Sequence, residues 1–196
     1  MASFGIAYQK TLEFEGGYVF DPDDGGGETY RGIARRFNPG WDGWKTIDRA
    51  RGTADFPQNL DSIEPLQAAA RKFYKQHYWD RFQGDMIVSQ EIADELFDTG
   101  VNLGVTRAVT FLQAALNILN RNQTLYQDIA DDGSCGPETL EAIGRYLQND
   151  PVEYLLKIAN ILQGMHYIAF MKKNPMQEKY ARGWLARVAI GPTPQA

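Results

Sequence analysis

The sequence predicts a mainly α-helical fold that has a short loop or hairpin region after its first helix. Apolar residues recur at helical spacing through most of the chain beyond residue 62, and glycine or proline separates the periodic segments. An earlier periodic segment, Phe4 to Glu15, stops at a glycine pair. The stretch from Arg35 to Leu60 is rich in Gly, Pro, Trp and Asp and has little periodicity, so we expect it to be irregular.

The composition is that of an ordinary globular protein. The chain has 196 residues, of which 43% are hydrophobic and 23% are charged, and this length suits one sizeable domain or two small ones. The formal net charge of −5 gives no basic footprint for nucleic acid and no bulk attraction to an anionic polymer. The single cysteine, Cys135, excludes an intramolecular disulfide.

Glu15 stands at the end of the first predicted helix. Gly16 and Gly17 follow it, and glycine enters the left-handed conformation that ends a helix without steric cost. The exposed carbonyls of a last turn disfavour a carboxylate, as do the nearby acidic residues Asp21, Asp23 and Asp24. We therefore expect the pKa of Glu15 to be raised, which suits a general acid.

The spacing of three polar residues strengthens this hypothesis. Asp24 and Thr29 follow Glu15 by nine and fourteen residues, across a turn-rich loop that can fold back over a cleft. Two carboxyl groups about 5–9.5 Å apart on either side of a sugar form the usual glycosidase arrangement. Thr29 would then hydrogen-bond the attacking water. Structural alternatives stay open: an arginine partner for Glu15, a turn-forming role for Asp24 and loop capping for Thr29.

The runs 15–18 (EGGY), 24–29 (DGGGET) and 32–33 (GI) resemble the signature of glycoside hydrolase family 108. Members are N-acetylmuramidases and are also described as secretion activators. The spacing is also similar to that of phage-type lysozymes. The resemblance implies a lysozyme-like fold with Glu15 as its acid and Asp24 and Thr29 as further catalytic candidates. The family usually has Pro-Gly-Gly-Ala-Thr at residues 25–29, so here glycine replaces proline and Glu28 adds a charge.

Four aromatic residues near this loop are candidates for sugar binding. Tyr18, Tyr30, Trp41 and Trp44 present flat rings that match the apolar faces of pyranoses. The alternative is that the tryptophans anchor an irregular loop to the core.

Helices are predicted from Ser62 to about Phe82, from about Ser89 to Gly100, and from Thr106 onward. The segment 98–104 (DTGVNLG), at the junction of the last two helices, resembles a second segment of the same family. Asn102 lies within it and is a candidate to bind an acetamido group; capping the next helix is the equal alternative.

The second half of the chain resembles a wall-binding segment. Residues 131–139 are similar to the Asp-Gly-x-x-Gly-Pro-x-Thr turn of peptidoglycan-binding repeats, which feeds a helix with Pro137 at its first position. Asp150 is predicted to cap the next helix, with Glu153 in a capping box. That helix is apolar on much of its circumference, so we expect it to be the central buried helix. We therefore expect a catalytic segment over residues 1–84 and a helical peptidoglycan-binding-like segment over residues 85–196, packed into one unit.

The sequence also argues against several other kinds of site. An EF-hand loop begun at Asp21 would have glycines at its fifth and twelfth positions, where Ca²⁺ ligands are required. His77 and His166 stand alone on apolar helical faces, so each is expected to be a core histidine. Cys135 has no catalytic partner in its turn. We expect neither a metal nor a cofactor.

These features predict a peptidoglycan hydrolase of the lysozyme type. The expected reaction is cleavage of the MurNAc-β-1,4-GlcNAc bond by general acid catalysis from Glu15. A lytic transglycosylase and a non-catalytic peptidoglycan-binding or secretion-assisting module are the alternatives. The expected partner is peptidoglycan glycan strands, without nucleic acid or membrane insertion, and the expected state is a monomer.

Targeting follows from the same sequence. Residues 1–17 lack the basic and apolar regions of a secretory signal, and no apolar run approaches a membrane span. We therefore expect synthesis in the cytoplasm and export to the cell wall through a holin or a dedicated exporter.

Overall fold

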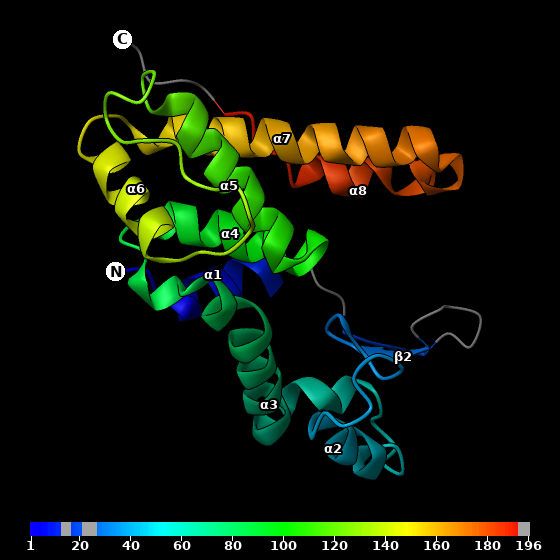
Figure 1. The fold of residues 1–196 in the computed structure, drawn as a ribbon. Helices are drawn as coiled ribbons and strands as arrows, with labels where there is room; N and C mark the ends of the chain where they lie inside the picture. Colours follow the sequence, from blue (N-terminus) through cyan, green and yellow to red (C-terminus); the bar gives the residue numbers. More distant parts are fainter. Residues whose placement is uncertain (13–16, 21–26, 192–196) are drawn as a thin grey trace.

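The computed structural model describes residues 1–12, 17–20 and 27–191, and it confirms a mainly helical, lysozyme-like fold (Figure 1). Its helices are α1 (Phe4–Leu12), α2 (Gly43–Ala50), α3 (Glu64–Tyr74), α4 (Gln90–Leu103), α5 (Val105–Leu119), α6 (Pro137–Leu147), α7 (Val152–Lys173) and α8 (Ala181–Ala186). The strands are β1 (Tyr18–Phe20), β2 (Glu28–Tyr30) and β3 (Ile33–Ala34). The short hairpin region after the first helix is therefore as predicted.

The elements form two regions that α3 connects. The small sheet and α2 lie at one end of α3, and α1, α4, α5, α6 and α7 gather at the other end (Figure 1). α7 packs along α5 and α4, and α8 folds back beside it.

The sheet is antiparallel in the order β1-β2-β3, and its register sorts the side chains onto two faces. Tyr18 pairs with Tyr30, and Val19 pairs with Thr29. Arg31 and Gly32 join β2 to β3 with φ angles of 46° and 77°. Positive φ at both positions defines a type I′ turn, which matches the twist of a two-residue hairpin and favours glycine.

α3 is shorter than the helix predicted for residues 62–82. It is preceded by a 3₁₀ turn at Gln58–Ser62 and followed by a π turn at Lys75–Trp79 and a 3₁₀ turn at Asp80–Phe82. The indole of Trp79 is fully buried, with its centroid 5.7 Å from that of Phe4 and 6.1 Å from that of Phe97. The sequence predicted a regular α-helix through this region. Instead, the π and 3₁₀ turns occur where the Trp79 ring packs into the core.

Ser89 and Gly104 set the limits of α4. The Ser89 hydroxyl accepts a hydrogen bond from the Ile92 N–H at 3.2 Å, as expected for an N-cap. The helix does not stop at Gly100 but continues to Leu103, and it ends where Gly104 takes a φ of 90°. Gly100 is tolerated inside the helix, where it faces Val105.

Polar side chains join α4 to α7 at three successive levels. Asn160 donates to Glu95 at 2.8 Å, Gln163 donates to Thr99 at 3.1 Å, and Tyr167 donates to Asn102 at 2.6 Å. Burial raises the pKa of Glu95. Because buried polar groups are costly without partners, these pairs fix the register of the two helices.

α7 differs from the central buried helix that its apolar sequence predicts. One side of it is buried, but Ile161, Met165, Ile168 and Phe170 are exposed. The predicted capping box is also wrong, because α7 is capped by Pro151 without a side-chain hydrogen bond and the Asp150 carboxylate accepts from Arg121 at 2.6 Å instead. An apolar circumference shows that a helix has apolar residues, not that neighbours enclose them.

Side chains of α5 organise the segment between α5 and α6. Gln113 is 1% exposed; its amide NH₂ donates to Asp132, Ser134 and Thr139, and its carbonyl accepts from the Gly133 N–H at 2.8 Å. One turn further on, Asn117 exchanges two hydrogen bonds of 2.8 and 2.9 Å with the backbone of Ile129. Pro137 begins α6, as predicted.

Two glycines provide a test of packing. A Cβ added at Gly84 would lie 2.3 Å from the indole of Trp79, whereas one at Gly144 in α6 would meet nothing within 4 Å. Gly84→Ala should lower the free energy of unfolding by about 2 kcal/mol through overpacking. Gly144→Ala should raise it by roughly 0.5–1 kcal/mol through helix propensity. Urea unfolding measures both, and equal effects of the two substitutions would contradict this packing.

Candidate functional site

Two of the three catalytic candidates, Glu15 and Asp24, lie outside the described residues, so their roles stay predictions. The described chain resumes at Gly17, whose carbonyl accepts a hydrogen bond from the Arg31 N–H at 3.1 Å. The Arg31 carbonyl in turn accepts from the Tyr74 hydroxyl at 2.6 Å. The strand that follows Glu15 is thereby tied through the hairpin turn to α3.

Thr29, the third catalytic candidate, is half-buried at the centre of β2. Its neighbours Glu28 and Tyr30 are buried and point to the opposite face of the sheet, toward α2 and α3. Thr29 pairs with Ala34 of β3, and the Ala34 carbonyl accepts from the Asn38 side chain at 3.2 Å. Thr29 therefore lies on the sheet face that is turned away from α2 and α3.

The two tyrosine candidates differ in how much of each ring is buried. Tyr30 has no exposed surface; its hydroxyl accepts from Gln67 at 2.8 Å, and burial raises its pKa. A ring without an exposed face cannot stack on a sugar, so the expected substrate contact of Tyr30 is corrected to a core role. Tyr18 is half-buried and packs edge-on against Phe56 with centroids 4.9 Å apart. Burial and the neighbouring Glu28 raise the pKa of Tyr18.

The two tryptophans mainly anchor the irregular loop. Trp44 is 2% exposed and its indole N–H donates to the Asn38 carbonyl at 2.8 Å. Trp41 is half-buried, edge-on to Trp44 with centroids 5.1 Å apart, and it lines a pocket with its remaining surface.

Asn102 lies in the last turn of α4 and is half-buried. Its side-chain oxygen accepts the hydroxyl proton of Tyr167, which stacks on Trp184 at 5.4 Å. This bond holds the Asn102 amide in one orientation, and a contact with an acetamido group stays a prediction.

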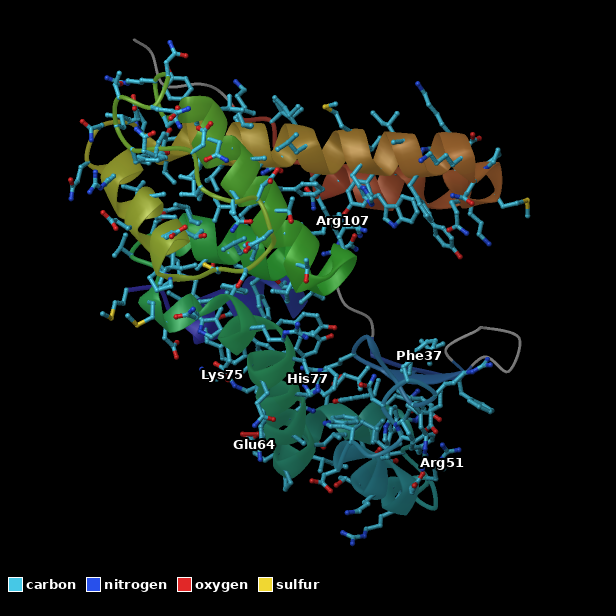
Figure 2. All side chains as sticks on the ribbon, viewed as in Figure 1. Phe37, Arg51, Glu64, Lys75, His77 and Arg107 are labelled. Carbon is cyan, nitrogen blue, oxygen red and sulfur yellow. The ribbon has the colours of Figure 1, made fainter. Side chains whose placement is uncertain are left out.

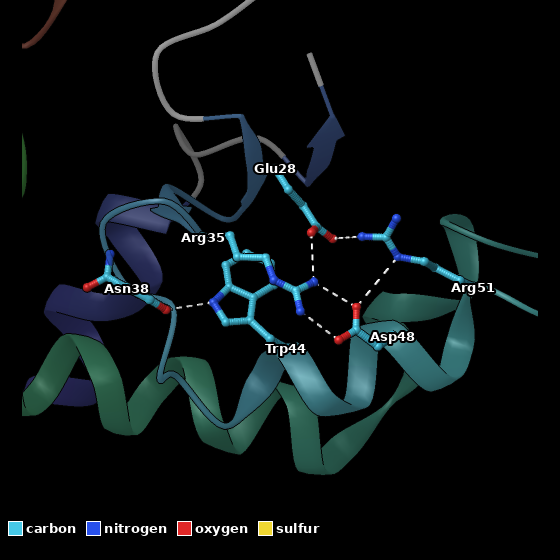
Figure 3. A network of polar contacts seen from close by, with 6 residues as sticks. All are labelled: Glu28, Arg35, Asn38, Trp44, Asp48 and Arg51. Carbon is cyan, nitrogen blue, oxygen red and sulfur yellow. Dashed lines mark hydrogen bonds and ion pairs between the residues drawn. The ribbon is translucent and has the colours of Figure 1, made fainter. Parts of the chain in front are cut away.

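A buried carboxylate holds the sheet against α2 (Figure 3). The side chain of Glu28 is 6% exposed and forms ion pairs with Arg35, at 2.8 Å, and with Arg51. Arg35 also makes two 2.7 Å hydrogen bonds to Asp48 and lies over the ring of Trp44. The charge of Glu28 is thus turned away from Thr29 and paired with both arginines.

An open groove lies between the two regions of the molecule. One part, of about 700 Å³, is lined by residues of the loop after β3, of α3 and its π turn, and of the α4–α5 junction. A second part, of about 450 Å³, adjoins it and shares Asn38, Phe73 and His77 with it. Figure 2 shows Phe37, His77 and Arg107 around the space between the sheet and α5. This groove is the candidate substrate site.

Sequence reasoning missed three residues of the groove. His77 was expected in the core, but it is exposed and stacks on Phe73 with centroids 4.1 Å apart. The π turn moves it off the apolar face that a regular helix would give it. Phe37, 72% exposed, lines the second part of the groove. Its place in a Gly- and Pro-rich loop was the available signal. Arg107 gave no signal of its own.

His166, in contrast, is half-buried on α7, 6.1 Å from the ring of Phe111. In the part of the chain that the structure describes, no cluster of three or more His, Cys, Asp or Glu side chains is arranged to hold a metal ion. No described helix is both long and apolar enough to cross a membrane.

Comparisons with known proteins agree with this geometry. Residues 8–104 match the family Glycosyl hydrolase 108, and residues 107–189 match the family Predicted Peptidoglycan domain. The two matches define a glycosidase with a peptidoglycan-directed segment and support a role as a peptidoglycan hydrolase. The chain belongs to glycosyl hydrolase family 108. The division predicted after residue 84 stays a prediction.

The fold has a counterpart among solved structures. The structure of Brucella abortus SagA is similar, with a TM-score of 0.59 and 22% sequence identity, over 94% of this chain and 88% of that chain. At this identity the likeness shows a shared fold. No curated protein matches the chain in a sequence comparison.

Neutralising the buried carboxylate should loosen the sheet. Glu28→Gln removes the charge shared by Arg35 and Arg51 and should lower the free energy of unfolding by roughly 2 kcal/mol, discounted because both arginines are partly exposed. Glu64→Gln, an exposed position at the start of α3, is the matched control. Equal urea midpoints for the two variants would contradict the structural role of Glu28.

The same network predicts a dependence on pH. Hydrogen bonds from Arg35 lower the pKa of Asp48 below its ordinary value. A depressed folded-state pKa stabilises the protein above the unfolded pKa of about 4, and that contribution is lost as the pH falls through the folded-state pKa. Urea midpoints measured from pH 7 to about pH 2 should therefore fall less steeply for Asp48→Asn than for the natural chain. Parallel curves would exclude this contribution.

Proposed function

We propose that the protein is an N-acetylmuramidase that hydrolyses the β-1,4 bond between N-acetylmuramic acid and N-acetylglucosamine. The observation that carries this proposal is the match of residues 8–104 to glycosyl hydrolase family 108. This range contains both sequence motifs, around Glu15 and around Asp24 to Thr29. The open groove between the loop after β3, α3 and α5 supports it, because a polymer cleaved within its length needs an extended site that is accessible from solvent.

In this mechanism Glu15 protonates the glycosidic oxygen as the bond to the leaving sugar breaks. Asp24 stabilises the positive charge that develops on the sugar ring or activates the attacking water. Thr29 holds that water by a hydrogen bond. Its place on the sheet face turned away from α2 and α3 supports this role, because Thr29 pairs with Ala34 and the Ala34 carbonyl accepts from the groove residue Asn38.

Other residues are assigned to substrate binding. The exposed ring of Phe37 offers an apolar face for a pyranose. Asn102 donates its side-chain N–H to an acetamido carbonyl, since Tyr167 already engages its oxygen. Tyr18 contributes the edge of its half-buried ring. The segment that matches the peptidoglycan domain retains the enzyme on the wall, where it acts as a monomer.

A lytic transglycosylase would use the same acid and the same glycan. It would form a 1,6-anhydro sugar by internal attack and would not need Thr29 to hold a water. The products separate the two reactions, because hydrolysis leaves a reducing N-acetylmuramic acid end that mass spectrometry distinguishes from the anhydro form.

Removing the acid should abolish cleavage. Glu15→Gln is expected to lower the rate of turbidity loss of purified cell walls by at least about 10²-fold, the scale of general acid catalysis. Glu13→Gln, the same substitution two residues earlier, is the matched control and should retain the natural rate. Lysis by Glu15→Gln at the rate of the natural chain would end the muramidase proposal.

Thr29→Val, which replaces only the hydroxyl with a methyl group, should slow hydrolysis without changing wall binding.

A further inference from the structure

We propose that the groove between α3 and the α4–α5 junction binds carboxylate groups of the glycan, through Arg81 and Arg107. In peptidoglycan these carboxylates come from the lactyl ether of N-acetylmuramic acid, when it is unsubstituted, or from the peptide stem attached to it. This inference rests on the proposed function and adds a site that selects the acidic substituents of the strand.

The first support is the charge of the lining. The 700 Å³ part of the groove is lined by Arg81, Arg107 and His77, and by no Asp or Glu among the described residues. This contrasts with the rest of an acidic chain of net charge −5. Smaller pockets elsewhere carry acidic side chains, such as Glu138 and Glu141 of α6. A local positive site in a negative protein selects anionic ligands by position.

The second support is the way the arginines are held. The Arg107 guanidinium donates to the Leu103 carbonyl at 3.0 Å, across the break between α4 and α5. Among the described residues neither Arg107 nor Arg81 forms an ion pair with a carboxylate, whereas Arg35, Arg51 and Arg121 do. Both side chains are exposed in the groove. A guanidinium in this state retains N–H groups for a second, bidentate partner.

The third support is the field around Arg107. The pKa of His166 is lowered by burial and by the positive charge of Arg107. His166 on α7 therefore lies within the electrostatic field of Arg107.

The apolar part of the lining fits the same ligand. Phe73, from α3, and Phe111, from α5, line the same part of the groove as the two arginines. A lactyl group and alanine residues of a stem present methyl groups close to carboxylates. The groove thus pairs apolar contact with charge recognition, as small-ligand sites commonly do.

Binding measured apart from cleavage tests this proposal. The full chain carrying Glu15→Gln, which leaves the strands intact, is titrated with three labelled ligands: glycan strands with peptide stems, strands stripped by an amidase that leaves free lactyl carboxylates, and a chito-oligosaccharide without carboxylates. Arg81→Gln, Arg107→Gln and their combination are added to this background. Arg49→Gln, an exposed arginine on α2 outside the groove, is the matched control.

Each arginine substitution should weaken binding of a carboxylate-bearing strand by about three- to tenfold, and the loss should shrink at high salt. Loss on the stem-bearing strand alone assigns the stem as the source, and loss on the stripped strand assigns the lactyl group. Arg107→Lys should retain part of the affinity because it keeps the charge but not the bidentate geometry. Unchanged affinities, absence of binding to all three ligands, or an equal loss on the chito-oligosaccharide would overturn the inference.

Cleavage by the natural chain reports on the proposed function separately. If the natural chain hydrolyses walls but the arginine variants bind with unchanged affinity, the muramidase proposal stands and only the carboxylate site is contradicted. Selective binding without hydrolysis would retain the site and remove the enzyme.

Discussion

The small sheet depends on one buried carboxylate. Three strands of two or three residues have too little apolar surface to hold together alone. Glu28 joins β2 to Arg35, beyond β3, and to Arg51, at the end of α2, so a single side chain closes the sheet onto the helix beneath it. Because Glu28 and Thr29 are adjacent in β2, the same contact that buries one turns the other toward the opposite face. A stability contact and the position of a proposed catalytic residue are therefore set together.

The carboxylate site that we propose in the groove reconciles an acidic protein with an acidic polymer. A net charge of −5 repels an anionic wall at a distance, but the screening length at physiological salt is only about 8 Å. Recognition can then be decided locally, where the break between α4 and α5 brings Arg107 to the groove. The residues that line the groove come from α3, α5 and the loop after β3, so the groove exists only when the two regions of the molecule are joined.

Sequence alone predicted the features that follow from local chemistry. Proline marked the start of α6 at Pro137, and glycines indicated a break between α4 and α5, which falls at Gly104 instead of the predicted Gly100, because each residue restricts or permits particular backbone angles. The motifs around Glu15 and Thr29 indicated the family before the fold was known.

Features set by tertiary packing were not predictable in this way. The sequence of α7 could not say which of its apolar residues neighbours would cover, and Ile161 and Met165 remain exposed. His77 left the core because a π turn displaced it, and Tyr30 entered the core although its motif suggested the site. Periodicity reports which residues are apolar or aromatic, whereas contacts between distant segments decide which of them are buried.

The loop between α5 and α6 depends for its structure on two side-chain amides of α5, those of Gln113 and Asn117. The backbone of Ile129 and of Gly133 hydrogen-bonds to side chains of a helix instead of to a neighbouring strand or turn. Exchange of these two N–H protons with solvent therefore requires the helix face to separate from the loop. They should exchange on the slow timescale of α5, although they belong to a segment without regular secondary structure.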